Sequence, residues 1–335
     1  MKIQIHPYHK ATLITLENDA GMRLTLSDIG AGLRDVFIDD EPMLCSPFSQ
    51  EEYLYATKAF YGKTIGPICG RIRLGAYEAG GKTCQMKVND GVNALHSSSL
   101  NFASVKFDYS FEDSKEGVSL IFAHRQKAIP GVYPANLDVK ITYFLPRKAK
   151  RFEIFVSATP DADAPINITN HSYFKLGGAK SILGAKLKIN ASKVATYTDD
   201  LICTGTKKAV DALDFQKEKK IGQDIASPEL RLPAFMGYDH AFVFKKNATD
   251  EAQVVLSQGK WKMELFTDAP AVQVYSLNFP RFLMLSSRKK EAEHSGITFE
   301  PVNVPGDPET FITKKGRAYT RHHVYRFQSK EADHD

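Results

Sequence analysis

The stretch Leu137-Asp138-Val139-Lys140-Ile141-Thr142-Tyr143-Phe144 decides the fold class. From Leu137 to Tyr143 its apolar and polar residues alternate with the period of two that a half-buried β-strand requires. Similar alternating runs lie beside it, separated by turn residues, at Val105–Phe111, Val118–His124 and Phe152–Ala158. Successive strands at such short spacing, with hardly a helical period between them, are typical of an antiparallel sandwich or barrel. The sequence therefore predicts an all-β protein with few short helices.

The hairpin pattern extends toward the N-terminus. Ala11–Leu16 and Met22–Ser27 alternate on either side of a turn at residues 18–21, and a second hairpin is predicted around Gly80-Gly81. With 335 residues, the chain is long enough for two ordinary domains or for one large β domain. The candidate linker, Asp211–Ser227, is too apolar in places to mark a boundary, so the pattern alone leaves both arrangements open.

The charge balance excludes some classes of partner. Lysine and arginine number 44 against 39 acidic residues, and the basic runs are short, scattered and without interleaved aromatic residues. This distribution argues against a nucleic-acid groove. No run approaches the roughly 18 apolar residues of a membrane span, and the first residues lack the apolar core of a signal peptide. We therefore expect a cytoplasmic protein without a membrane partner.

The cysteines show no metal-binding pattern. Cys45, Cys69, Cys84 and Cys203 have neither CxxC spacing nor a matching pair of histidines. We expect reduced thiols and no metal site.

One histidine stands in an unusual setting. His171 lies among small polar residues, just before the aromatic pair Tyr173-Phe174 and the turn Gly177-Gly178. Histidine can gain or lose a proton near neutral pH, so it is the first candidate for proton transfer. A lone strand histidine is more often structural, and a catalytic role requires partners. Candidate partners are the polar residues at other strand ends, although spacing alone does not show that they meet: Arg71, His96, Asn170, Asp239, Gln273 and Glu300.

The chain resembles the aldose 1-epimerase (galactose mutarotase) family through several short motifs in the same order. The matching segments are Gly70-Arg71-Ile72, Asn89–His96, Thr169–Leu176, Gly237–His240, Val272–Tyr275 and Thr298-Phe299-Glu300. Each motif alone is weak, and their shared order makes the match strong.

The resemblance implies one large antiparallel β-sandwich spanning residues 1–335, with an open sugar groove and a frayed tail at 329–335. It also implies interconversion of the α and β anomers of an aldohexose. That reaction removes the proton of the C1 hydroxyl, protonates the ring oxygen, opens the ring and closes it on the other face. The implied substrate is a small sugar, neither a metal nor an organic cofactor is needed, and monomer and homodimer both remain open.

By the same resemblance, Glu300 is the base, His171 is the acid at the ring oxygen, and His96 bonds the sugar near the reacting centre. Sugar hydroxyls would be bound by Arg71, Asp239, Gln273 and Asn170. The base must be ionised and the acid protonated. We expect the opposite charges of Glu300 and His171 to hold both forms near neutral pH.

Departures from the family pattern bear on which sugar is bound. Gly70 stands where the family usually has asparagine, Pro67 where it often has arginine, and Pro301-Val302 follow the proposed base. A phosphorylated sugar is one alternative substrate, since Arg73 and Lys175 lie beside the motifs. A non-catalytic sugar-binding protein is another alternative, but loss of the acid or the base would be its signature, and both are present.

Overall fold

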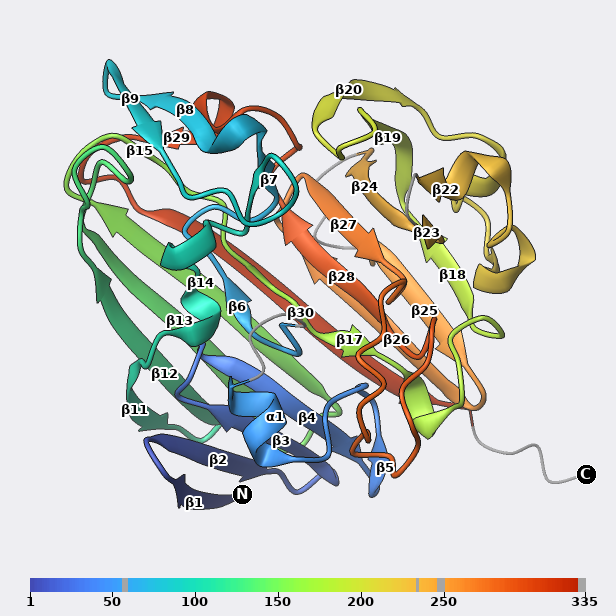
Figure 1. Ribbon diagram of the computed structural model, residues 1–335. Coiled ribbons are helices and arrows are strands. Elements are labelled where there is room, and N and C mark those ends of the chain that lie inside the picture. The colour runs from blue at the N-terminus through green and yellow to red at the C-terminus, as the bar shows by residue number, and fades with distance from the viewer. Residues whose placement is uncertain (56–59, 233–234, 246–250, 331–335) are drawn as a thin grey trace, which may run out of the picture.

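Antiparallel strands make up most of the computed structural model, which describes residues 1–55, 60–232, 235–245 and 251–330 (Figure 1). The largest sheet has nine strands, in the spatial order β11-β12-β13-β14-β30-β26-β25-β18-β21. Their bounds are β11 (Asp108–Asp113), β12 (Gly117–Gln126), β13 (Leu137–Pro146), β14 (Arg151–Pro160), β30 (Tyr319–Ser329), β26 (Trp261–Thr267), β25 (Val254–Gln258), β18 (Lys186–Ile189) and β21 (Lys219–Lys220).

A six-stranded sheet lies in front of the nine-stranded sheet in Figure 1, and a five-stranded sheet lies beside them near the N-terminus. In spatial order, the six strands are β17 (Tyr173–Phe174), β28 (Ile297–Val302), β27 (Ala271–Tyr275), β24 (Asp239–Phe244), β19 (Ala191–Tyr197) and β20 (Cys203–Lys208). The five strands are β1 (Lys2–Tyr8), β2 (Ala11–Glu17), β3 (Met22–Ser27), β4 (Gly32–Ile38) and β5 (Glu41–Pro42).

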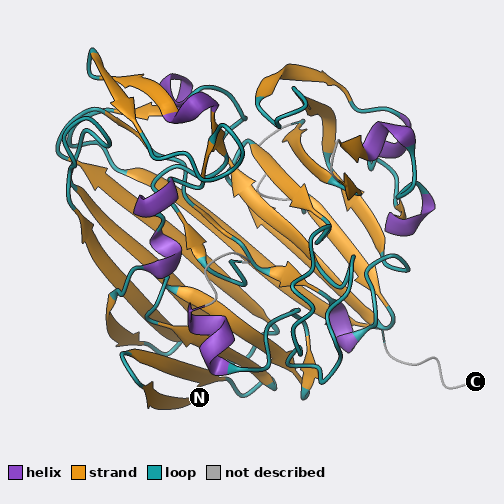
Figure 2. Cartoon of the chain, viewed as in Figure 1, coloured by secondary structure: helices purple, strands orange, loops and turns teal. Residues whose placement is uncertain are grey.

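Short strand pairs and short helices complete the described chain. The pairs are β6 (Thr64–Ile65) with β16 (Thr169–Asn170), β7 (Arg71–Ile72) with β10 (Ala94–Leu95), β8 (Ala76–Ala79) with β9 (Lys82–Gln85), β15 (Ala164–Pro165) with β29 (Ile312–Thr313), and β22 (Arg231–Leu232) with β23 (Phe235–Met236). Helix α1 (Gln50–Tyr55) is joined by the 3-10 turns η1 (Arg73–Gly75), η2 (Ser98–Leu100), η3 (Phe102–Ser104), η4 (Leu176–Gly178), η5 (Asp211–Leu213), η6 (Ile221–Gln223), η7 (Pro228–Leu230) and η8 (Pro308–Phe311). Figure 2 shows these helical pieces outside the sheets.

Aromatic side chains join the two large sheets. Phe174 of β17 stacks on Tyr325 of β30, with ring centroids 5.3 Å apart, and lies 6.0 Å from the ring of Phe299 on β28. Tyr325 also stacks on Phe152 of β14 at 4.8 Å. Because all four rings are buried, each removes a large apolar area from water at the boundary between the sheets. The main core of the protein therefore lies between the two sheets.

The structure confirms the predicted fold class, since the described chain is mostly β and its sheets are antiparallel. The decisive stretch forms most of β13, in which Leu137, Val139, Ile141 and Tyr143 are buried and the residues between them are not. The predicted tail needs a correction at its start, because Ser329 pairs with Trp261 at the end of β30. Residues 331–335 lie outside the described part of the chain.

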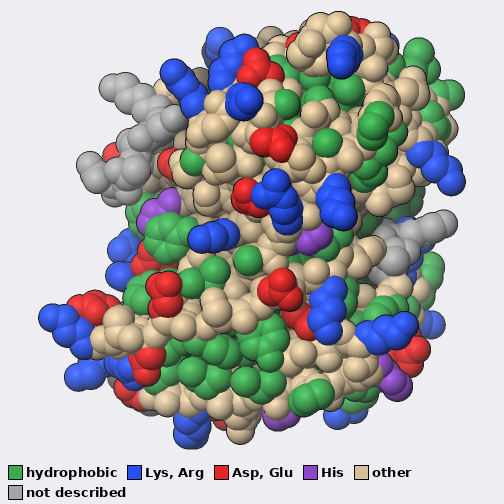
Figure 3. All heavy atoms as spheres, turned by 90° about the vertical axis from the view of Figure 1, so that its left-hand side faces the viewer, with side chains coloured by type: hydrophobic (Ala, Val, Ile, Leu, Met, Phe, Trp, Pro, Cys, Tyr) green, Lys and Arg blue, Asp and Glu red, His purple; other side chains and the backbone are tan. Residues whose placement is uncertain are grey.

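Basic and acidic side chains are intermingled on the face shown in Figure 3, and no stretch of one sign dominates it. Such a surface does not provide the continuous basic footprint that nucleic-acid binding requires. Within the described residues, no helix is both long enough and apolar enough to span a membrane.

Replacing Phe174 with alanine tests the packing between the sheets. Because the ring is fully buried against Tyr325 and Phe299, we expect the substitution to lower the free energy of unfolding by about 3–5 kcal/mol. Phe282→Ala is the matched control, since the Phe282 side chain is 63% exposed and its loss should change stability by less than about 0.5 kcal/mol. Urea denaturation followed by circular dichroism measures both. Equal effects would contradict this account of the core.

Candidate active site

A cavity of about 300 Å³ opens on the face of the six-stranded sheet that points away from the aromatic core. This size is typical of sites for small molecules. With one exception, the residues that the sequence proposed for a site line this cavity: Arg71, His96, His171, Asp239, Gln273 and Glu300.

Strand register explains how distant positions reach one face. Gln273 of β27 pairs directly with Glu300 of β28, and Tyr275 pairs with Thr298. Asp239 at the start of β24 pairs with Tyr275 from the other side. Directly paired residues share a face of a sheet, and so do alternate residues along one strand. All five side chains therefore point to the same side, and the residues between them, such as Phe299, enter the core.

His171 enters the cavity from the short segment between β16 and β17. Its N–H donates to the carbonyl of Lys63 and its carbonyl accepts from the N–H of Gly62, both at 2.9 Å. A Cβ on Gly62 would lie 1.8 Å from the carbonyl oxygen of Leu33, so only glycine fits there. These backbone contacts hold His171 at a defined place, which a catalytic group requires.

His96 follows β10 and faces His171 across the cavity. The two imidazole rings are perpendicular, with centroids 5.8 Å apart. His96 has a φ of 52°, a left-handed conformation that is uncommon outside glycine. Its Nδ1 accepts from the N–H of Gly70 at 3.2 Å, which leaves Nε2 to carry a proton when the ring is neutral. His96 is therefore a hydrogen-bond donor of fixed orientation.

Glu300 and His171 form a buried pair. Oε1 of Glu300 lies 3.4 Å from Nε2 of His171 and accepts from the hydroxyl of Thr298 at 3.0 Å. The two residues are only 3% and 5% exposed. A carboxyl group and an imidazole therefore face one small space, close enough to act on adjacent atoms of one ligand.

Burial determines the ionisation of this pair in a way that the sequence did not predict. Removal from water raises the pKa of Glu300 to about 8, although the Thr298 hydroxyl opposes that rise, and it lowers the pKa of His171 to about 4. We expected opposite charges to stabilise each other, but desolvation of both groups dominates and favours their neutral forms. Between these values the pair holds one proton, on the carboxyl group.

A chain of polar contacts crosses the cavity from Arg71. The guanidinium lies 4.0 Å from Oδ2 of Asp239, and the Asp239 carboxylate accepts from the side-chain amide of Gln273 at 2.6 Å. Burial raises the pKa of Asp239, and Arg71 opposes this rise. The amide oxygen of Gln273 accepts from the hydroxyl of Tyr197 at 3.4 Å. Together these groups present donors and acceptors suited to vicinal hydroxyls.

Asn170 is the exception, and its predicted role in sugar binding is corrected. Its amide donates to the carbonyl of Gly62 at 2.8 Å and to the hydroxyl of Tyr143 at 3.2 Å, and its oxygen accepts from Ser172 at 2.5 Å. Because side chains alternate along an extended chain, Asn170 points away from the side of His171. It is buried and does not line the cavity. Asn170 therefore stabilises the segment that carries His171.

Lys175 is also displaced from the role considered for it. The sequence placed it beside the motifs as a possible phosphate ligand, but it is fully buried and does not line the cavity. Burial lowers the pKa of its ammonium group. Arg73 does line the cavity, so it is the only one of the two proposed phosphate ligands that reaches the site.

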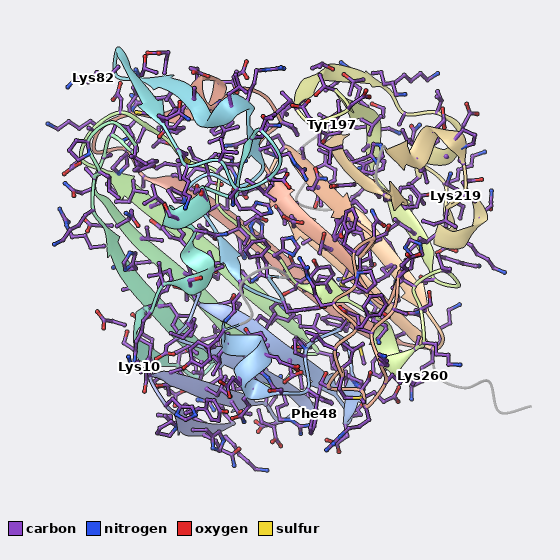
Figure 4. All side chains as sticks on the ribbon, in the orientation of Figure 1. Lys10, Phe48, Lys82, Tyr197, Lys219 and Lys260 are labelled. Carbon is purple, nitrogen blue, oxygen red and sulfur yellow. The ribbon has the colours of Figure 1, made fainter. Side chains whose placement is uncertain are left out.

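The structure adds cavity residues that the sequence did not reveal. Phe60 packs its ring against both His96, at 5.2 Å, and His171, at 5.8 Å. Tyr197, labelled in Figure 4 near β24 and β27, reaches Gln273 from β19. Asp90 bonds Arg71. Aromatic residues occur throughout the chain, so only their position in the fold distinguishes these rings from core residues.

The four cysteines are free thiols. Among the residues that the structure describes, no three His, Cys, Asp or Glu side chains are placed to bind a metal ion together.

A sequence profile of the aldose 1-epimerase family matches residues 12–326. The chain belongs to this family. Its members are isomerases, and a sugar is the class of substrate that membership implies. The aldose 1-epimerase of Escherichia coli is 28% identical over 309 residues, which cover 88% of this chain and 87% of that protein. Human galactose mutarotase is 28% identical over 267 residues, covering 77% and 74% of the two chains.

Solved structures of the family have the same fold. The galactose 1-epimerase from Lactobacillus acidophilus superposes with a TM-score of 0.90 at 27% identity, over 99% of this chain and 100% of that one. An aldose epimerase homologue from Caenorhabditis elegans gives a TM-score of 0.85 at 20% identity, over 96% and 100%. The second similarity concerns the fold alone.

The raised pKa of Glu300 predicts a pH dependence of stability. The unfolded carboxyl ionises near its ordinary pKa and the folded one only near 8, so the folded state holds an extra proton in between. This extra proton contributes fully to the free energy of unfolding below the ordinary pKa of the carboxyl group. The contribution is lost as the pH rises toward 8, with a slope of up to about 1.4 kcal/mol per pH unit. The buried histidines, whose pKa values are lowered, add the opposite pH dependence to the parent and to Glu300→Gln alike. Urea denaturation from pH 5 to 8 should therefore show that the stability of the parent relative to Glu300→Gln falls as the pH rises.

Glu264→Gln is the control for that experiment, because Glu264 has a lowered pKa and lies on β26, outside the cavity. This variant should keep the pH dependence of stability that the parent shows between pH 5 and 8. If the parent and Glu300→Gln show the same pH dependence over that range, the carboxyl of Glu300 is not held in its protonated form.

Proposed function

We propose that this protein interconverts the α and β anomers of a free aldohexose such as galactose or glucose, with Glu300 as the base and His171 as the acid. The observation that carries the proposal is the buried pair of Glu300 and His171, 3.4 Å apart, inside a cavity that is also lined by hydrogen-bonding side chains. His96 would hydrogen-bond the sugar near the reacting carbon, and Arg71, Asp239 and Gln273 would bind its hydroxyls. Family membership supports this class of reaction.

The reaction needs one proton removed and one proton supplied. Glu300 takes the proton of the C1 hydroxyl while His171 gives a proton to the ring oxygen, so the C1–ring oxygen bond breaks and an open aldehyde forms. Rotation about the bond to C1 presents the other face of the carbonyl. Closure then reverses both transfers. Positioned acids and bases of this kind are worth roughly 10²–10⁴-fold in rate.

The single proton of the pair suits this cycle. The reactive arrangement has a carboxylate and an imidazolium, and ring opening converts it to a neutral carboxyl and a neutral imidazole. Both arrangements carry one proton and no net charge, so the pair need not exchange protons with water. Burial favours the neutral arrangement, and hydrogen bonds from a bound sugar to the carboxylate of Glu300 would offset part of that preference.

Substitution of the acid and the base gives the direct test. We expect Glu300→Gln and His171→Gln each to lower kcat by roughly 10²–10⁴-fold, because each loses one of the two proton transfers. Polarimetry of freshly dissolved α-galactose and α-glucose, corrected for the uncatalysed rate, measures the effect. Glu264→Gln removes a carboxylate outside the cavity and should retain the parent's rate.

A parent protein that binds these sugars without accelerating their equilibration would support a non-catalytic sugar-binding role instead. A marked preference for glucose 6-phosphate in the same assay would overturn the choice of a free sugar.

The pH profile provides a second test. The pair holds one proton between about pH 4 and about pH 8, so we expect kcat/KM to be nearly constant in that window. Below it, a second proton removes the base, and above it, loss of the last proton removes the acid. Saturation-transfer NMR on galactose measures the rate of anomer exchange at low and at high pH, even where uncatalysed exchange is appreciable. A fall in kcat/KM centred near pH 6.5 would instead assign an ordinary histidine pKa to the acid.

A further inference from the structure

Arg71 is held by a second carboxylate that the proposed reaction does not use. Its Nε donates to Oδ2 of Asp90 at 2.6 Å, and its NH1 lies 4.0 Å from Asp239 on the other side. Arg71 is 20% exposed and Asp90 39% exposed in their side chains. The charge of one guanidinium is thus opposed by two carboxylates at the edge of the cavity.

Hydrogen bonds fix the conformation of the turn that carries Asp90. The backbone groups of Asp90 and Asn93 bond each other in both directions, at 2.9 Å and 3.1 Å, and Gly91 between them has a φ of 59°. The side chain of Asn89 bonds both backbone groups of Leu95, which precedes His96. Because the turn is fixed by these bonds, Asp90 is held in place before any ligand arrives.

A weaker electrostatic interaction involves Arg73, which also lines the cavity. Asp200 lies beside Arg73, which helps to hold the pKa of Asp200 below its ordinary value, after larger contributions from Thr198 and Asn93. The side-chain amide of Asn93 donates to the Asp200 carboxylate at 2.9 Å. Arg71 is therefore contacted directly by an aspartate, and Arg73 and Arg281 also line the cavity.

This arrangement has a consequence for ligand charge. An unopposed arginine in a partly buried site attracts a carboxylate or a phosphate and binds it with two parallel hydrogen bonds. Asp90 occupies the Nε edge of Arg71 and places a negative charge where such an anion would lie. Neutral hydroxyls can still accept from the remaining guanidinium N–H groups. Juxtaposed like charges are strongly unfavourable and are a common means of rejecting a ligand.

We propose that Asp90 is a specificity-determining residue, which opposes the charge of Arg71 so that the cavity accepts neutral sugars and rejects sugars that carry a carboxylate or phosphate group. The inference rests on the proposed function for the site, and it extends that function by naming the charge class of the substrate and the residue that selects it.

The test compares binding of D-galactose and D-galacturonate, which differ by a carboxylate in place of the C6 hydroxymethyl group. Isothermal titration calorimetry at pH 7 and low salt measures both dissociation constants for the parent and for Asp90→Asn. We expect the parent to bind galactose more tightly than galacturonate. Asp90→Asn should shift the ratio of the two dissociation constants toward galacturonate by about tenfold or more, and added salt should reduce the shift.

Asp307→Asn is the matched control, since Asp307 also lines the cavity but forms no ion pair with an arginine within the described residues. It should leave the ratio close to that of the parent. An equal shift in both variants would mean that general cavity charge, and not the contact with Arg71, selects the ligand. No shift in Asp90→Asn would overturn the proposal.

Binding separates this inference from the proposed reaction. A parent that prefers galactose, with the expected shift in Asp90→Asn but no acceleration of anomer exchange, would support the role of Asp90 and overturn the catalytic function. Fast anomer exchange without the shift in Asp90→Asn would support the catalytic function and overturn the role of Asp90. A parent that binds neither sugar would overturn both.

Discussion

Strand β28 must serve two environments at once, and the rest of the site depends on this constraint. Phe299 points into the aromatic core between the sheets, and its neighbours Thr298 and Glu300 point to the opposite side, where Glu300 lines the cavity. Because alternate side chains lie on opposite faces of a strand, the packing of Phe299 fixes the direction of the carboxyl group. A shift of one residue in register would exchange core and cavity positions. Core packing thus provides the precision that the proposed role of Glu300 in proton transfer needs.

The cost of this placement is desolvation. Glu300 and His171 are almost fully removed from water, and both pKa values move toward the neutral form. A water-exposed pair would be easier to ionise but would also exchange its proton with solvent. The buried pair retains one proton over a broad pH range, and a net transfer within one sugar needs no more than that. These electrostatics are consistent with the charge-neutral proton exchange that we propose for the site.

Charge compensation continues around the cavity. Asp90 and Asp239 oppose Arg71, and Asp200 lies beside Arg73. Lys175, the other cation beside the motifs, is fully buried away from the cavity. The contact with Asp90 thus favours the proposed role of Arg71 as a hydrogen-bond donor to the hydroxyl groups of a neutral sugar.

The sequence by itself determined the fold class, because the period-two pattern in stretches such as 137–144 directly reflects which side chains are buried. Its motifs also identified the family and the residues that line the cavity from β7, β24, β27 and β28. The sequence could not determine the direction in which a side chain points or how deeply it is buried. Asn170 lies one position from His171 and faces the opposite side, Lys175 is enclosed, and burial shifts the pKa values of Glu300 and His171. The contact of Asp90 with Arg71 likewise appears only in the fold. Only the tertiary structure decided these features, because direction, burial and contact arise from pairing between segments far apart in the chain.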